Sequence, residues 1–115
     1  MRRFLLILSM FSVSATSFAQ TITLSSFQST KDHPVVVSYI SGVGAGYVYA
    51  NALLMSEGKP LIFCQPMGLA LIGKNYIQLI ESEAKRPSVA KPYPGDTVVE
   101  VVLLNALRAN FPCRK

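Results

Sequence analysis

Few side chains in this sequence could carry out chemistry, and the two cysteines are the most informative of them. Cys64 stands near the middle of the chain and Cys113 close to its end. His33 is the single histidine, so no second histidine is available for a metal pair. The six acidic residues are scattered along the chain. Because a catalytic centre needs a base and a residue that orients it, we expect no enzyme, no metal site and no cofactor.

The beginning of the chain indicates its destination. Arg2 and Arg3 precede a short apolar run, and small residues follow at positions 17 and 19, where a signal peptidase reads them. We predict a signal peptide over residues 1–19 and one domain over residues 20–115. A membrane anchor is the weaker alternative, because the apolar run is far below the roughly 20 residues that a span needs. Removal of the signal leaves 96 of the 115 residues and lowers the net charge from +5 to +3.

Export gives the two cysteines a structural purpose. In an oxidising compartment two cysteines in a small domain most simply form one disulfide, so we predict a bond between Cys64 and Cys113. Closing a loop of about 50 residues should stabilise the fold by roughly 4 kcal/mol. The short, basic start of the signal is bacterial in type and places the protein in the periplasm. The mild positive charge and the export argue against nucleic acid, and we expect no membrane association after signal cleavage.

Residues 35–55 form the first long element, and we predict a helix there, although three consecutive valines favour a strand and three glycines weaken a helix. Their apolar side chains recur at intervals of three and four residues and share one stripe. Pro34 suits the first turn of this helix, and Asp32 lies near its N-cap. Small residues at positions 42, 46 and 50 predict a face on which another helix lies close. The glycine-rich stretch 42–46 imitates a dinucleotide-binding loop, but its third glycine comes one position early and the acidic residue expected about 20 positions later is missing.

Three further helices are predicted around this one. A short helix opens near Leu24, a second follows an apolar stripe from Leu69 to Glu83, and the last runs to Asn110. Thr97 and Glu100 have the spacing of a capping box for the last helix. The expected fold is therefore all-α, a small compact domain of about four helices with one disulfide.

Two details of these helices predict contacts. Glu81 and Lys85 are four apart in the order that favours an ion pair on a helix. Val101 and Leu104 fall inside the polar arc of the last helix, so either a neighbouring helix covers them or they belong to a contact surface.

The stretch from residue 85 to residue 95 has no periodicity. It contains Lys85, Arg86, Lys91 and Tyr93 together with three prolines. A solvated linker is one interpretation. The functional interpretation is a presented loop, because prolines limit the entropy lost on docking and because tyrosine and arginine are common interface anchors.

The order of features resembles the periplasmic immunity proteins of type VI secretion amidase effectors, the Tai family and its relatives. The matching pieces are Tyr39-Ile40-Ser41-Gly42-Val43, Cys64-Gln65-Pro66 and the run from Asn105 to Cys113. The terminal alanine-leucine-arginine followed by phenylalanine-proline-cysteine is the most specific piece. Many relatives carry a further cysteine pair that joins the N-terminal segment to the first long helix, and this sequence has no cysteine there.

The resemblance implies a non-enzymatic protein that binds a peptidoglycan amidase effector and blocks its cysteine–histidine active site. We expect Lys85, Arg86, Lys91 and Tyr93 to contact that partner, and the loop over residues 56–61 is the alternative. Some members of the family are homodimers, and in a homodimer of this chain Val101 and Leu104 would be subunit contacts.

A periplasmic acid-stress chaperone of the HdeA type is the competing interpretation, because such chaperones are also small, helical and single-bridged. A switch of that kind relies on many carboxylates that protonate in acid, and six acids against nine bases leave little to titrate. An inhibitor of host lysozyme fits less well, because the helical pattern contrasts with the β-rich inhibitors of that class.

Overall fold

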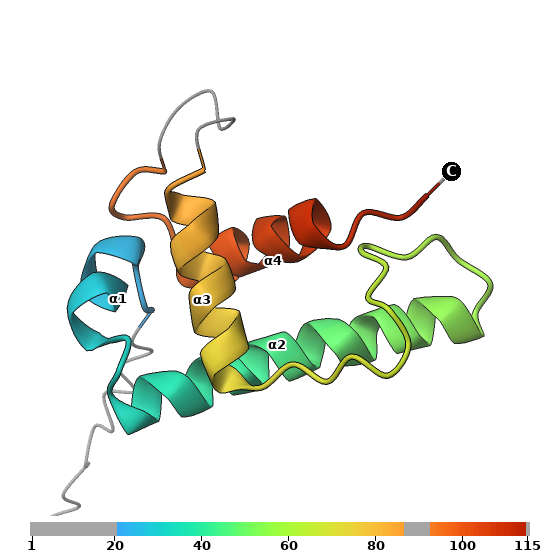
Figure 1. Ribbon diagram of the computed structural model, residues 1–115, viewed down its shortest axis with the longest axis horizontal. Helices are drawn as coiled ribbons and strands as arrows, with labels where there is room; N and C mark the ends of the chain where they lie inside the picture. Colours follow the sequence, from blue (N-terminus) through green and yellow to red (C-terminus); the bar gives the residue numbers. More distant parts are fainter. Residues whose placement is uncertain (1–20, 87–92, 115) are drawn as a thin grey trace, which may run out of the picture.

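The computed structural model describes residues 21–86 and 93–114, and this part of the chain is all-α (Figure 1). Its helices are α1 (Leu24–Thr30), α2 (Pro34–Ser56), α3 (Gly73–Ala84) and α4 (Val99–Asn110). The long helix α2 forms the base, α3 crosses it, and α4 packs against both. The predicted all-α domain of about four helices is therefore confirmed. The predicted signal peptide, residues 1–19, lies outside the described residues.

The hydrophobic core lies where these helices meet. Its fully buried large side chains come from every helix and from the segment before α3, and they are Phe27, Ile40, Phe63, Ile80, Val99, Val102, Leu103 and Leu107. The broad apolar arc of the last helix is buried: Val98 is partly buried, and the buried residues of α4 are Val99, Val102, Leu103, Ala106 and Leu107. Burying a large apolar side chain stabilises by about 1.5–3 kcal/mol, so this junction holds the helices together.

The N-terminal segment is held by hydrogen bonds instead of a second disulfide. The Leu24 amide donates to the Thr97 carbonyl at 2.8 Å, and the Val99 amide donates to the Ile22 carbonyl at 3.0 Å. Phe27 on α1 is fully buried. The short helix predicted near Leu24 is confirmed, and its apolar face explains why it packs without a covalent link.

The start of α2 differs from the prediction by one residue. His33, not Asp32, is the N-cap, and its Nδ1 accepts a hydrogen bond from the Val35 amide at 3.3 Å. Pro34 occupies the first turn as predicted, where a missing amide hydrogen costs nothing. The His33 side chain is exposed, and its role in the fold is to cap the first turn of α2.

The close approach between α2 and α3 occurs at a glycine that the pattern did not single out. Gly42 and Gly46 have no other described group within 4 Å of a Cβ position, so the predicted small-residue face is wrong. Gly44 is buried against the ring of Tyr76, and Gly73 at the start of α3 lies against Val37 and Ser41. The apolar stripe of α2 continues through position 44, which explains why contact falls there.

Helix α3 begins later than its stripe suggested. Gly68 has a positive φ of 82°, and the Leu69 amide donates to the Pro66 carbonyl at 3.2 Å, so the chain is still turning there. The helix begins after Ile72, whose amide donates to Asn75 Oδ1 at 2.9 Å. This bond satisfies one of the free amides that precede a helix.

The predicted pair between Glu81 and Lys85 is also wrong. Glu81 forms an ion pair with Lys31 at the end of α1 instead. Lys85 is the C-cap of α3 and is exposed.

Helix α4 lacks the predicted capping box. Its N-cap is Val98, with no side-chain cap. The Thr97 carbonyl accepts a hydrogen bond from the Leu24 amide, and Val98 forms an isolated antiparallel bridge with Thr23. This stretch is therefore extended, and the helix starts one residue later than predicted. Glu100 turns toward α2 and accepts a hydrogen bond from the Tyr39 hydroxyl.

The segment between α2 and α3 is fastened at two points. Asn51 of α2 is buried; its Oδ1 accepts from the Ile62 amide at 2.9 Å, and its Nδ2 donates to the Phe63 carbonyl at 2.7 Å. Cys64 forms the predicted disulfide with Cys113. The disulfide ties the end of the chain to this segment, as expected from the sequence.

Candidate functional site

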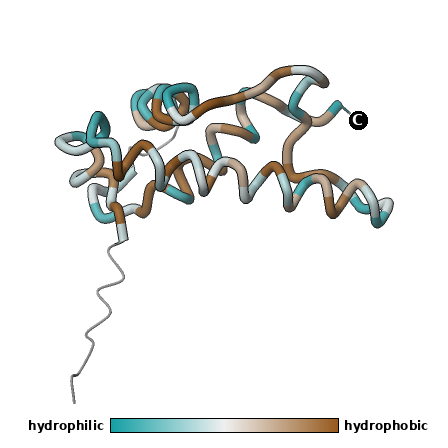
Figure 2. The backbone as a smooth tube through the Cα atoms, turned by 90° about the horizontal axis from the view of Figure 1, so that it is seen from below, coloured by the Kyte–Doolittle hydropathy of each residue, from teal (hydrophilic) through white to brown (hydrophobic). Residues whose placement is uncertain are grey.

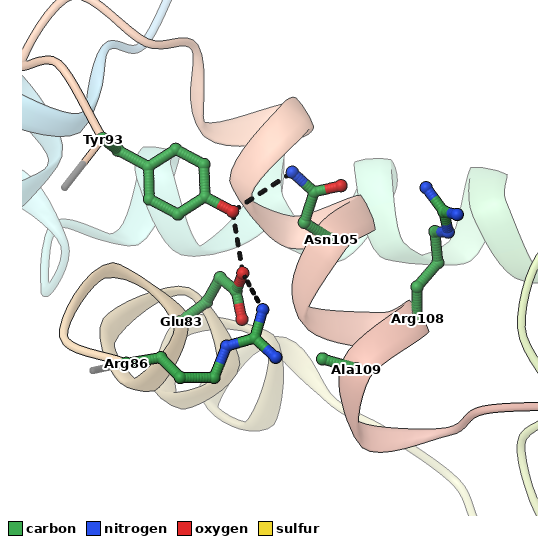
Figure 3. Close-up of a pocket in the computed structure, with 6 residues that line it drawn as sticks. All are labelled: Glu83, Arg86, Tyr93, Asn105, Arg108 and Ala109. Carbon is green, nitrogen blue, oxygen red and sulfur yellow. Dashed lines mark hydrogen bonds and ion pairs between the residues drawn. The ribbon is translucent and has the colours of Figure 1, made fainter. Parts of the chain in front are cut away.

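An open polar pocket lies between α3 and α4, at the base of the predicted interaction loop (Figure 3). Its volume is about 420 Å³. Two elements and the residues flanking the loop supply its lining, which consists of Glu83, Arg86, Tyr93, Asn105, Arg108 and Ala109. Three of these residues, Glu83, Arg86 and Arg108, carry charges.

Glu83 is the centre of this pocket. It is only 2% exposed, although it carries a carboxylate. Its Oε1 accepts a hydrogen bond from the Tyr93 hydroxyl at 2.7 Å and another from Arg86 Nη2 at 2.7 Å. Burying a carboxylate is costly unless it is paired and hydrogen-bonded, and these two partners provide both.

A third hydrogen bond extends the network to α4. Asn105 Nδ2 donates to the Tyr93 hydroxyl oxygen at 3.1 Å. Burial and the hydrogen bond to Glu83 raise the pKa of the Tyr93 phenol, while the bond from Asn105 lowers it in part. The phenol therefore keeps its proton at neutral pH and acts as the donor to Glu83.

The structure brings two of the four predicted partner-binding residues together. Arg86 lies near the start of the predicted loop and Tyr93 near its end, and both donate hydrogen bonds to the same oxygen of Glu83. Lys85 lies on the exposed end of α3 and takes no part in this network. Lys91 lies outside the described residues. The contact of these side chains with a partner stays a prediction.

Three lining residues were not among the sequence candidates. Asn105, Arg108 and Ala109 lie on the C-terminal half of α4 and line the pocket (Figure 3). Asn105 and Arg108 are three apart on the polar arc of the helix, and that spacing was a usable signal. Arg108 is exposed and has no carboxylate within ion-pair distance among the described residues.

The two candidate dimer residues lie on α4 outside this pocket. Val101 is 46% exposed and Leu104 is partly buried. Their predicted role as subunit contacts stays a prediction.

The remaining chemistry of the described residues is sparse. No three histidine, cysteine or acidic side chains of residues 21–86 and 93–114 gather closely enough to hold a metal ion. In the same ranges, no helix combines the length and the apolar character that crossing a membrane requires. A comparison of the chain with family models, curated proteins and solved structures finds no match.

Proposed function

We propose that this protein is a periplasmic immunity protein that binds and blocks an exported peptidoglycan amidase effector. The sequence pattern from Tyr39 to Cys113 motivates the proposal, and the all-α fold with its Cys64–Cys113 bond is compatible with it. The observation that carries it is the double attachment of Glu83, which fixes Arg86 and Tyr93 at the two ends of the predicted loop.

This attachment favours tight binding for a physical reason. A loop that is held at both ends loses less conformational entropy when it docks, and prolines within it reduce that loss further. The anchoring residues are a tyrosine and an arginine, which are enriched among residues that dominate binding energy.

The charges of the pocket indicate the kind of group that it meets. Glu83 is neutralised by Arg86, and Arg108 is left as a cation without a described partner. An acidic side chain beside the amidase cleft would pair with Arg108 while the loop covers the entrance. Inhibition is then a matter of occlusion and needs no chemistry from the immunity protein.

The experiment measures inhibition of a purified type VI amidase encoded in the same genome. The wild-type chain should inhibit it, and the variant with Arg86, Lys91 and Tyr93 all changed to alanine should lose inhibition. Arg108→Ala should weaken inhibition by about 10- to 150-fold, as expected for one hydrogen bond to a charged group. Full inhibition by the triple variant would refute the role of the loop.

Two controls keep the result interpretable. Lys74→Ala removes an exposed cation from the other end of α3, and we expect inhibition to stay unchanged. Circular dichroism of the triple variant checks that loss of the Tyr93 bond to Glu83 has not unfolded the protein.

A further inference from the structure

One side of α2 carries an apolar stripe that no described part of the chain covers. The helix contains no charged residue along its 23 positions, and most of it is white to brown in Figure 2. The other helices lie on one side of α2 (Figure 1). Because a helix that is apolar all round is normally buried all round, the uncovered side of α2 indicates a binding surface.

Six residues define this stripe, and all of them are exposed. They recur at alternating intervals of four and three positions and are Val35, Tyr39, Gly42, Gly46, Tyr49 and Leu53. The exposed fraction reaches 76% at Tyr49 and 69% at Val35. Alternation of four and three is the spacing of a seam along which two helices pack at a shallow angle. We call these six residues the α2 seam.

The α2 seam has the same residue types when it is read in either direction. Glycines at 42 and 46 form its centre, tyrosines at 39 and 49 flank them, and the aliphatic Val35 and Leu53 form its ends. In an antiparallel pair with a two-fold axis at the level of position 44, glycine meets glycine, tyrosine meets tyrosine and valine meets leucine. A two-fold contact requires this symmetry, because residue i then contacts residue j and residue j contacts residue i. The symmetry identifies the occupant as a second copy of the chain.

The centre of the α2 seam leaves room for that second helix. A Cβ built at Gly42 or Gly46 meets no other described group within 4 Å, so no helix of the same chain approaches there. Helix axes can come within about 8 Å where small side chains lie between them. Tyr39 is positioned in advance, because its hydroxyl donates a hydrogen bond to Glu100.

Electrostatics favour the antiparallel direction. The uncharged seam produces no repulsion between the copies. An antiparallel pair places the positive end of one helix macrodipole beside the negative end of the other. Asp32 precedes α2 and Lys59 follows it, and both are exposed. The antiparallel pair brings them to the same end as opposite charges, whereas a parallel pair would bring each to its own copy.

The length of α2 sets the size of the contact. A helix of 23 residues is about 35 Å long and about 10 Å wide. Covering a third to a half of its lateral surface buries roughly 350–550 Å² per copy, or roughly 700–1,100 Å² in total. Weak and transient interfaces bury less than about 1,200 Å². The contact therefore predicts a weak dimer, with a dissociation constant on the order of 1–100 μM.

We propose that two copies of this chain pair through the α2 seam as an antiparallel dimer with two-fold symmetry. This surface is separate from the polar pocket and from Val101 and Leu104 of α4, the subunit contacts predicted from the sequence. The proposal does not rest on the proposed immunity function.

The test measures self-association of the full chain, purified from the periplasm, by sedimentation velocity from about 1 to about 500 μM. The wild-type chain should change from monomer to dimer across this range. Two double variants then test the register. Val35→Lys with Leu53→Lys places like charges opposite each other in the antiparallel dimer and should weaken it. Val35→Glu with Leu53→Lys places opposite charges there.

The second double variant should dimerise at least about fivefold more tightly than the first, because each dimer contains two such pairs. Sodium chloride at about 1 M should reduce this difference, since it screens exposed charges. Val101→Lys is the matched control: it adds a lysine at an exposed apolar position of α4 outside the seam, and the dimer should persist. Circular dichroism checks that every variant folds.

Three results would overturn the proposal: a wild-type chain that stays monomeric throughout, equal association of the two double variants, or dissociation by Val101→Lys alone. A parallel dimer would show itself as equal association, because both double variants then face like charges. Failure here leaves the inhibition experiment unaffected, and failure of inhibition leaves the α2 seam standing.

Discussion

Gly44 provides a sharp test of how α2 and α3 pack. A Cβ atom at this position would lie 2.4 Å from two carbon atoms of the Tyr76 ring, and real Cβ contacts essentially never fall under 3.0 Å. The Tyr76 ring is itself only 4% exposed, so it has little space into which it could move. Overpacking of this kind costs about 1–3 kcal/mol, more where neighbours cannot give way. Alanine recovers about 1 kcal/mol of helix propensity relative to glycine.

We therefore expect Gly44→Ala to lower the free energy of unfolding by up to about 2 kcal/mol. Gly46→Ala is the matched control, because no other described group lies within 4 Å of a Cβ at Gly46. It should raise the free energy of unfolding by up to about 1 kcal/mol. The two variants would then differ by the overpacking cost, which corresponds to at least about 4 °C in Tm for a domain of this size.

Urea and thermal unfolding followed by circular dichroism at 222 nm measure both quantities. Adding Tyr76→Leu to Gly44→Ala should remove most of the penalty, because a smaller side chain then faces the new methyl group. If Gly44→Ala stabilises the protein as much as Gly46→Ala does, the described packing of α2 against α3 is wrong.

Three other predictions concern the disulfide, the buried carboxylate of Glu83 and the titration of Tyr39. Changing Cys64 and Cys113 to alanine should lower the free energy of unfolding by about 4 kcal/mol, since the bond spans 49 positions. Urea unfolding measures this loss, and dithiothreitol should not lower the stability of the double variant further. Glu83→Ala should cost about 1–3 kcal/mol by leaving the Tyr93 hydroxyl without its acceptor, and Glu83→Gln, which retains an acceptor, should cost less; an equal loss in urea unfolding would contradict the network. The hydrogen bond to Glu100, then burial, raises the pKa of Tyr39 to about 12, so the native state keeps a proton that the unfolded chain releases near pH 10. Stability should be fully present below pH 10 and fall between pH 10 and 12; Tyr39→Phe should flatten this fall in urea midpoints, and an unchanged slope would contradict the assignment.

The order of helices and the disulfide could be predicted because they depend on local periodicity and on composition. The stripe of α2 and the buried arc of α4 were both readable in the sequence. The number and placement of the cysteines, together with a signal-like start, were sufficient to predict the Cys64–Cys113 bond. Burial of Phe27 was the less obvious part, because it depends on the way α1 is bonded to the stretch before α4.

The errors arose where distant segments compete with local preference. Thr97 could have capped α4, but its carbonyl accepts a hydrogen bond from the Leu24 amide in the extended stretch that precedes the helix, and the N-cap falls at Val98. Glu81 pairs with Lys31, fifty positions away, instead of with the lysine one turn later. A local sequence pattern indicates neither of these two contacts, because both depend on how α1 packs against the rest of the chain.

The candidate site shows the same division. The loop flanks Arg86 and Tyr93 were identifiable from their residue types. Their attachment to Glu83 was not, because a glutamate on the apolar stripe of a helix is interpretable as a core position only when its partners are known. The hollow between the last turns of α2 and residues 61–69 depends on how that segment runs along α2, which no periodicity in the sequence indicates.

The central claim is immunity, and a growth assay tests it most directly. The full chain would be expressed in bacteria that receive a periplasm-directed type VI amidase from the same genome. We predict that the chain protects growth and that deletion of residues 1–19 abolishes protection, because the antidote then stays in the wrong compartment. Absence of protection against every amidase encoded in that genome would contradict the proposed function.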